Sequence, residues 1–188
     1  MSFIKALFTL VRTQKSETDL LRLLDSLEHS TLDGAPISST NEAALIMSPN
    51  NHPFFNDLPN SAHEILSNTG YENNIGIRLE DDNFGTKWII FSGTNGAILT
   101  SLVDSMSKAL ANIQLADQMI AAVFKFNINL KPIYCICNYR TKKFYPFSPM
   151  DKKTRDTDLE MNFIHILSTQ GIPIEPIEQW YALWETPF

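Results

Sequence analysis

The sequence has few of the residues that form disulfides or bind metal ions. Among its 188 residues are two cysteines, Cys135 and Cys137, which stand two positions apart in a strand-like run. Their side chains therefore share one face, at a spacing that suits a mutual disulfide poorly. The four histidines are scattered and show no metal-ligand spacing: His29, His52, His63 and His165. We expect two small buried thiols, a reducing compartment, no metal and no other cofactor.

The sequence also lacks a basic excess and a long apolar run. Its 15 Lys and Arg residues stand against 21 Asp and Glu residues, and the net charge of -6 argues against nucleic-acid binding. The opening run Phe3 to Val11 is apolar, but it is too short to span a bilayer and lacks the layout of a cleavable signal. We expect residues 1–15 to form a short amphipathic segment that docks on the body. The alternative is weak contact with a membrane surface through Phe3 to Val11.

What is present is a globular composition with regular hydrophobic patterns. Apolar residues make up 44% and charged residues 19% of the 188 positions, which indicates one domain, residues 1–188. The periodicity predicts helices over residues 17–29, the second half of 53–67, 99–113 and 154–169. It predicts strands over residues 43–47, 75–80, 87–92, 119–126 and 133–139, and a loop over 31–41. We therefore expect an α+β fold in which an antiparallel sheet of about five strands is packed by helices.

The segment 144–156, FYPFSPMDKKTRD, stands between the last predicted strand and the last predicted helix. Pro146 and Pro149 fix their own φ and favour extended conformations at the residues before them, which predicts a stiff, non-helical turn. The aromatic residues of this turn are Phe144, Tyr145 and Phe147. We interpret the segment as a packing corner or a binding edge.

Charged residues follow at the start of the last predicted helix. Asp156 and Glu160 would lie one helical turn apart and could act as a paired acid and base. In the other interpretation, Asp156 favours the helix dipole, while Arg155 pairs with Glu160 or Glu175 and ties down the tail. We favour this structural interpretation, because no nucleophile with a base, phosphate loop or metal set accompanies the cluster. We therefore expect no catalytic residue.

The tail is rich in proline and aromatic residues. Gly171 and Pro173 end the last predicted helix, and residues 171–188 read GIPIEPIEQWYALWETPF. We expect this tail to lie as an extended aromatic arm across the body and to bury Trp180 and Trp184.

Several sequence blocks together resemble a known family. They occur in the order GTKWIIF, AAVFKF, YRTKKFYPFSP, RDTDLE and PIEPIEQWYALWETP. In these blocks, over most of residues 82–188, the chain resembles the PspA-associated protein family PspAB. Ser148 and Ala182 depart from the pattern, since the family has alanine and commonly proline there. The order of elements is also similar, in topology only, to type III secretion chaperones and YbjN-like proteins.

The resemblance implies a non-enzymatic, cytoplasmic adaptor or regulator in a membrane (envelope) stress response. The implied partners are a PspA-like membrane-stress protein or an HtpX-type membrane protease, with a homodimer and a place at the inner face of the membrane as further expectations. The alternatives are a protein-binding module like the type III secretion chaperones, or a small hydrolase that uses Arg155, Asp156 and Glu160. We expect recognition to centre on a corner made of Phe144, Tyr145, Pro146, Phe147, Pro149, Arg155, Asp156, Glu160, Glu175, Trp180 and Trp184.

Overall fold

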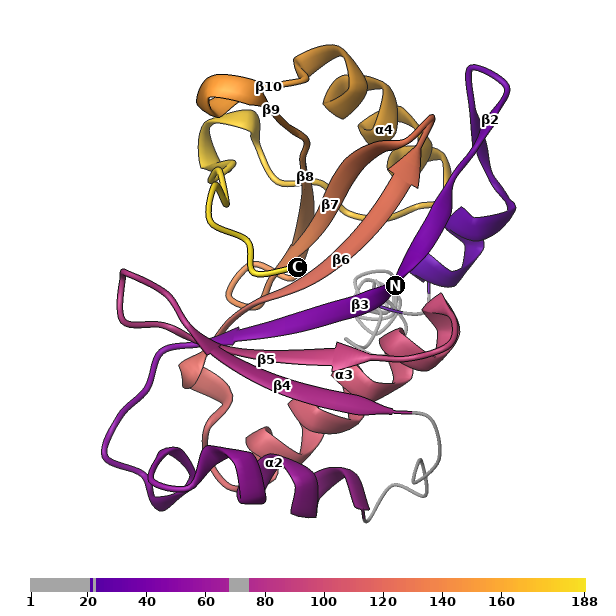
Figure 1. Ribbon diagram of the computed structural model, residues 1–188. Helices are drawn as coiled ribbons and strands as arrows, with labels where there is room; N and C mark the ends of the chain where they lie inside the picture. Colours follow the sequence, from indigo (N-terminus) through magenta and orange to yellow (C-terminus); the bar gives the residue numbers. More distant parts are fainter. Residues whose placement is uncertain (1–20, 22, 68–74) are drawn as a thin grey trace, which may run out of the picture.

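A six-stranded antiparallel sheet forms the centre of the molecule (Figure 1). The computed structural model describes residue 21, residues 23–67 and residues 75–188, so the predicted segment 1–15 and the start of the first predicted helix lie outside the described part. The strand order is β4-β5-β3-β6-β7-β8. The strands are β3 (Ser38–Met47), β4 (Gly76–Asp81), β5 (Lys87–Ser92), β6 (Met119–Ile128), β7 (Lys131–Asn138) and β8 (Lys143–Phe147). The expected α+β class is confirmed, with six strands in this sheet in place of about five.

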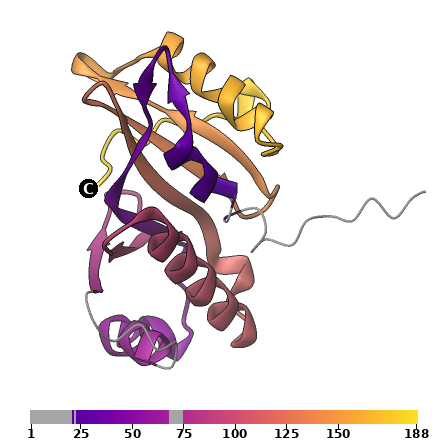
Figure 2. The same cartoon turned by 90° about the vertical axis from the view of Figure 1, so that its right-hand side faces the viewer.

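Helices cover one face of the sheet and enclose the larger core (Figure 2). They are η1 (Leu23–His29), α2 (Leu58–Ser67), α3 (Gly96–Asn112) and α4 (Thr157–Thr169), joined by the short turns η2 (Pro53–Phe55) and η3 (Ala116–Gln118). Asn95 caps α3, because its side chain accepts a hydrogen bond of 2.9 Å from the Ile98 N–H. The predicted apolar stripe of α3 is buried through Leu110, whereas Ile113 follows the last helical residue and is 39% exposed.

The opposite face of the sheet is also apolar, and no helix of the described chain covers it. We call it the strap face; its buried residues are Ala44, Ile46, Trp88, Ile90, Ala121, Val123, Tyr134, Ile136, Tyr145 and Phe147. The end of the chain packs against it through Trp180, Ala182, Leu183 and Phe188. In Figure 2 the chain end marked C lies on the side of the sheet away from α3. The tail contains one helical turn, η5 (Ile177–Gln179).

The prediction of a loop over residues 31–41 was wrong. The segment forms a small hairpin of β1 (Thr31–Leu32) and β2 (Ala35–Pro36), and β3 then begins at Ser38. Asp33 and Gly34 make the turn with φ of 51° and 80°, the left-handed conformations that an Asp-Gly hairpin requires. Gly34, Pro36 and the Ser-Ser-Thr cluster are typical of loops, but the polar residues after Ile37 lie in the first half of β3, which is partly or fully exposed.

The prediction of a turn over residues 144–156 was also wrong in its first half. Residues Lys143–Phe147 form the edge strand β8, and β9 (Pro149–Met150), η4 (Asp151–Lys153) and β10 (Thr154–Arg155) follow before α4. Pro146 tolerates this position because an edge strand needs no outward N–H group. The expected burial of Trp180 and Trp184 is corrected as well, since Trp180 is half-buried and Trp184 is 36% exposed. Cys135 and Cys137 are buried and are not joined by a disulfide, as expected.

Candidate functional site

The outer edge of β8 is closed by the protein's own tail. The inner side of β8 pairs with β7, with Phe147 opposite Tyr134. On the outer side, the Phe144 N–H donates to the Pro173 oxygen at 2.8 Å, and the Glu175 N–H donates to the Phe144 oxygen at 2.8 Å. Residues 173–175 therefore run parallel to β8 as a short additional edge.

Arg155 of β10, Glu160 of α4 and the backbone N–H of Asp156 complete the closure. Pro146 has no N–H, and its oxygen accepts a hydrogen bond of 3.0 Å from Arg155 Nη2. The Ser148 N–H donates to Glu160 Oε1 at 2.7 Å, and the Ser148 oxygen accepts from the Asp156 N–H at 2.9 Å. We call this arrangement of residues 173–175 with Arg155, Asp156 and Glu160 the β8 clasp. Because it uses the outward groups of β8, an added strand from a partner has no hydrogen bonds to make there.

A buried ion pair holds the clasp together. Glu160 is 1% exposed, and both of its carboxylate oxygens accept hydrogen bonds from Arg155 Nε, at 2.9 and 3.0 Å. The Arg155 guanidinium lies 5.3 Å from the ring centre of Phe147 and 5.7 Å from that of Trp180. Of the two partners expected for Arg155, it is Glu160 that makes the salt bridge.

Glu175 holds the base of the tail. Its buried carboxylate accepts a hydrogen bond of 3.0 Å from Asn138 Nδ2 and another from the Thr141 hydroxyl. Its backbone oxygen accepts from Trp180 Nε1 at 3.0 Å. Burial first, and the nearby Glu175 carboxylate in addition, raise the pKa of the Tyr145 phenol well above its ordinary value, while Arg155 acts in the opposite direction.

Asp156 faces a different partner from Glu160. It caps α4 by accepting from the Leu159 N–H at 3.1 Å, and it forms a salt bridge of 2.7 Å with Lys131 Nζ. The hydrogen bond from Lys131, followed by the one from Leu159, lowers the pKa of the Asp156 carboxyl. The two carboxylates are one helical turn apart in sequence, but each is engaged by its own cation.

The last residues of the chain, 181–188, form what we call the strap. Phe188 stands edge-on to the rings of Trp88 and Tyr134, at centroid distances of 6.4 and 6.0 Å, and its backbone oxygen accepts a hydrogen bond of 2.7 Å from the Tyr134 hydroxyl. Trp184 stands edge-on to Phe147 at 5.0 Å. The strap therefore rests on the strap face mainly through aromatic contacts.

A cavity of about 120 Å³ opens beside the strap. The β4–β5 turn, η4 and the strap line it, through Asp82, Phe84, Trp88, Lys153, Ala182, Leu183, Trp184 and Glu185. Phe84 is 84% and Tyr181 67% exposed, which is unusual for large aromatic side chains. Burial raises the pKa of Asp82, but hydrogen bonds from Thr86, Trp88 and the Phe84 N–H outweigh it, so the net pKa is lowered. Sequence reasoning missed this cavity, because Phe84 lies in a polar turn with no pattern around it.

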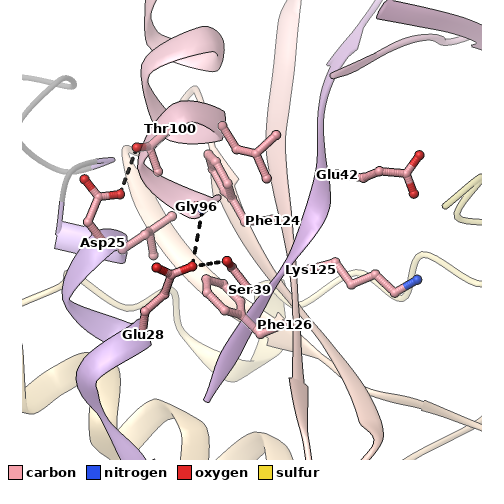
Figure 3. A pocket seen from close by; sticks show the side chains of 11 residues that line it. Asp25, Glu28, Ser39, Glu42, Gly96, Thr100, Phe124, Lys125 and Phe126 are labelled. Carbon is pink, nitrogen blue, oxygen red and sulfur yellow. Dashed lines mark hydrogen bonds between the residues drawn. The ribbon is translucent and has the colours of Figure 1, made fainter. Parts of the chain in front are cut away.

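A second, much smaller cavity lies at the N-terminus of α3 (Figure 3). Glu28 from η1 accepts hydrogen bonds from the Gly96 N–H at 3.3 Å and from the Ser39 hydroxyl, and Asp25 accepts one of 2.8 Å from the Thr100 hydroxyl. Its volume of about 10 Å³ holds no more than about one water molecule. These contacts fasten η1 to α3.

The fold defines the protein as an α+β domain with a helix-backed antiparallel sheet whose other face carries its own C-terminal tail. The family model PspAB, described as PspA associated protein B, matches residues 1–188, and the chain belongs to this family. Neither a curated protein nor a solved structure gives a significant match. In the described part of the chain, no helix has the length and apolar character needed to cross a membrane, and no group of His, Cys, Asp and Glu side chains could hold a metal ion.

Proposed function

We propose that this protein is a non-enzymatic adaptor that binds a PspA-type membrane-stress protein. The family description supports it, since it names an association with PspA. The observation that carries the proposal is the exposure of two aromatic side chains: Phe84, which lines the cavity together with Lys153, and Tyr181, the first residue of the strap. Exposed aromatic side chains next to a pocket are typical of surfaces that bind another protein.

The size of the cavity favours a side chain over a metabolite. Small-molecule sites usually enclose roughly 300–1,000 Å³, whereas this cavity measures about 120 Å³. One apolar side chain of a partner would fill it, with Lys153 and Glu185 at its border.

The candidate catalytic residues have structural roles that support a non-enzymatic function. Arg155 and Glu160 hold the edge of β8, and Asp156 caps α4 and pairs with Lys131. A hydrolase would need an acid and a base that face one substrate position. The proposal therefore assigns the cluster to the β8 clasp.

The proposal also covers the cellular location of the protein, its second partner and its oligomeric state. We place the adaptor in the cytoplasm near the inner face of the membrane, with an HtpX-type membrane protease as a second partner and a homodimer as its assembly. Contact between Phe3 to Val11 and lipid lies outside the described residues and stays a prediction.

A binding assay with purified proteins tests the adaptor role. We expect the PspA-like protein of the same host to bind the wild-type chain, and the double variant Phe84→Ala, Tyr181→Ala to bind at least about tenfold more weakly. Leu130→Ala is the matched control, because Leu130 is a 96% exposed apolar side chain in the β6–β7 turn. Tyr145 and Phe147 are unsuitable for this test, since both are buried and their truncation would change folding.

Two results would overturn the proposal. One is that the wild-type chain fails to bind the PspA-like protein in solution. The other is that the double variant and Leu130→Ala both bind as the wild type does. That result would show that neither Phe84 nor Tyr181 contacts the partner.

A further inference from the structure

The two halves of the tail are fastened in different ways. Residues 172–175 make backbone hydrogen bonds to the body, including both bonds between the 173–175 segment and Phe144. Among the described residues, no backbone-to-backbone hydrogen bond joins residues 181–188 to the sheet. Side chains of the sheet and of the β4–β5 turn hold the strap instead: Tyr134 and Arg78 donate hydrogen bonds to the backbone oxygens of Phe188 and Pro187, and Asn83 donates one to Glu185.

The burial of the strap differs sharply from that of the face below it. All ten residues of the strap face are at most 6% exposed. Every residue of the strap itself is partly or largely exposed. The strap thus keeps water from an apolar surface without being enclosed by the core.

We propose that the strap is a displaceable occupant of the strap face, and that an extended, aromatic-rich apolar segment of a partner protein binds there in its place. The strap shows the chemistry that the face accepts: an edge-on aromatic ring between Trp88 and Tyr134, another against Phe147, and a backbone oxygen at the Tyr134 hydroxyl. An incoming segment would reproduce these contacts. Only the identity of the partner rests on the proposed adaptor role, and the exchange itself does not.

Opening of the strap sets the apparent affinity for such a segment. A ligand that binds only the open form has its affinity reduced by the fraction of molecules that are open. Weakening the strap in the chain should therefore tighten binding of a competing segment, and locking the strap should abolish it. If a segment instead bound on top of a closed strap, neither change would have this effect on its affinity. The two opposite changes in affinity therefore distinguish displacement from binding on a closed strap.

The test uses the full chain and a fluorescently labelled peptide with the sequence of residues 176–188. We expect the wild-type chain to bind this peptide, and Phe188→Ala to bind it about tenfold more tightly, because the variant loses two aromatic contacts in its own strap. Leu130→Ala is the control, since Leu130 is 96% exposed in the β6–β7 turn outside the strap, and it should bind the peptide as the wild type does. A peptide with alanine at the Leu183 and Phe188 positions should not compete.

A locked strap gives the second arm of the test. Asn83 and Glu185 are exposed and joined by a hydrogen bond of 2.8 Å, so Asn83→Cys, Glu185→Cys can be bridged with a short thiol crosslinker while buried Cys135 and Cys137 stay unreacted. The bridged protein should lose peptide binding, and the unbridged double variant should keep it.

Three outcomes would overturn the proposal. Equal binding by bridged and unbridged protein places the peptide outside the strap face. No binding by either the wild type or a folded Phe188→Ala chain shows that the strap does not exchange. A dimer in light scattering that disappears on bridging assigns the face to the strap of a second copy. Because none of these measurements contains a PspA-like protein, their failure is separate from failure of the adaptor role.

Discussion

Removal of Arg155 is the sharpest test of the β8 clasp. Arg155→Ala leaves the Glu160 carboxylate, with its side chain 2% exposed, without its cation. Breaking a buried ion pair from one side costs about 3–5 kcal/mol. We expect a cost at the lower end of this range, because the Arg155 side chain is 23% exposed and the Ser148 N–H still donates a hydrogen bond to the Glu160 carboxylate. We expect the free energy of unfolding to fall by about 3 kcal/mol, a large part of the 5–15 kcal/mol typical of a domain.

Urea denaturation followed by circular dichroism measures this loss, and tryptophan fluorescence reports on Trp180 beside the guanidinium. Arg140→Ala is the control, because Arg140 is exposed in the β7–β8 turn and its removal should change stability by less than about 0.5 kcal/mol. The double variant Arg155→Met, Glu160→Gln should recover part of the loss, since no charge is then buried alone. A loss below about 1 kcal/mol for Arg155→Ala, or a double variant less stable than the sum of its parts, would refute the reasoning.

The remaining predictions concern the start of two helices. A Cβ at Gly96 would lie 2.7 Å from Glu28 Oε1 and 3.1 Å from Ser39 Oγ, so Gly96→Ala should cost about 1 kcal/mol more in the wild type than in a Glu28→Ala chain, where the nearer obstacle is gone. Denaturation of the four variants tests this, and equal effects in both backgrounds would contradict it. The pKa of the Asp156 carboxyl is lower in the folded chain than in the unfolded chain, where it is about 4. The carboxylate therefore stabilises the fold fully above pH about 4, and this stabilisation is lost as the pH falls through the folded-state pKa. Asp156→Asn should therefore be about 1 kcal/mol less stable than the wild type at pH 7 and converge with it in acid; parallel pH profiles would argue against the Lys131 salt bridge as the cause.

Local patterns were enough to predict the elements whose residues alternate or recur strongly. The stripe from Leu99 to Leu110 predicted α3, and the alternation around residues 75–92 predicted the β4–β5 hairpin. Both depend on side-chain periodicity, which is a property of the chain itself. The same holds for the two cysteines, whose spacing along one strand predicted that they would not form a disulfide with each other.

Patterns failed where a residue's state depends on a distant segment. The first half of β3 has polar residues, and the strand begins there because Ser38 and Ser39 pair with Asn127 and Phe126 of β6. Likewise, two prolines in the 144–149 segment suggested a turn, but Pro146 lies in the edge strand β8. An edge strand needs no outward N–H there, and the Pro146 oxygen accepts a hydrogen bond from the Arg155 guanidinium.

The sequence by itself determined the α+β class and the main helices, and it drew attention to the 144–156 segment and the tail as candidates for a site. Only the tertiary structure decided what these residues do. It paired Arg155 with Glu160 and turned Asp156 toward Lys131, because the direction of each side chain depends on which strand or helix lies opposite. It also divided the tail into a hydrogen-bonded edge and a strap on an apolar face, and a linear pattern cannot distinguish these two parts because both are rich in proline and aromatic residues.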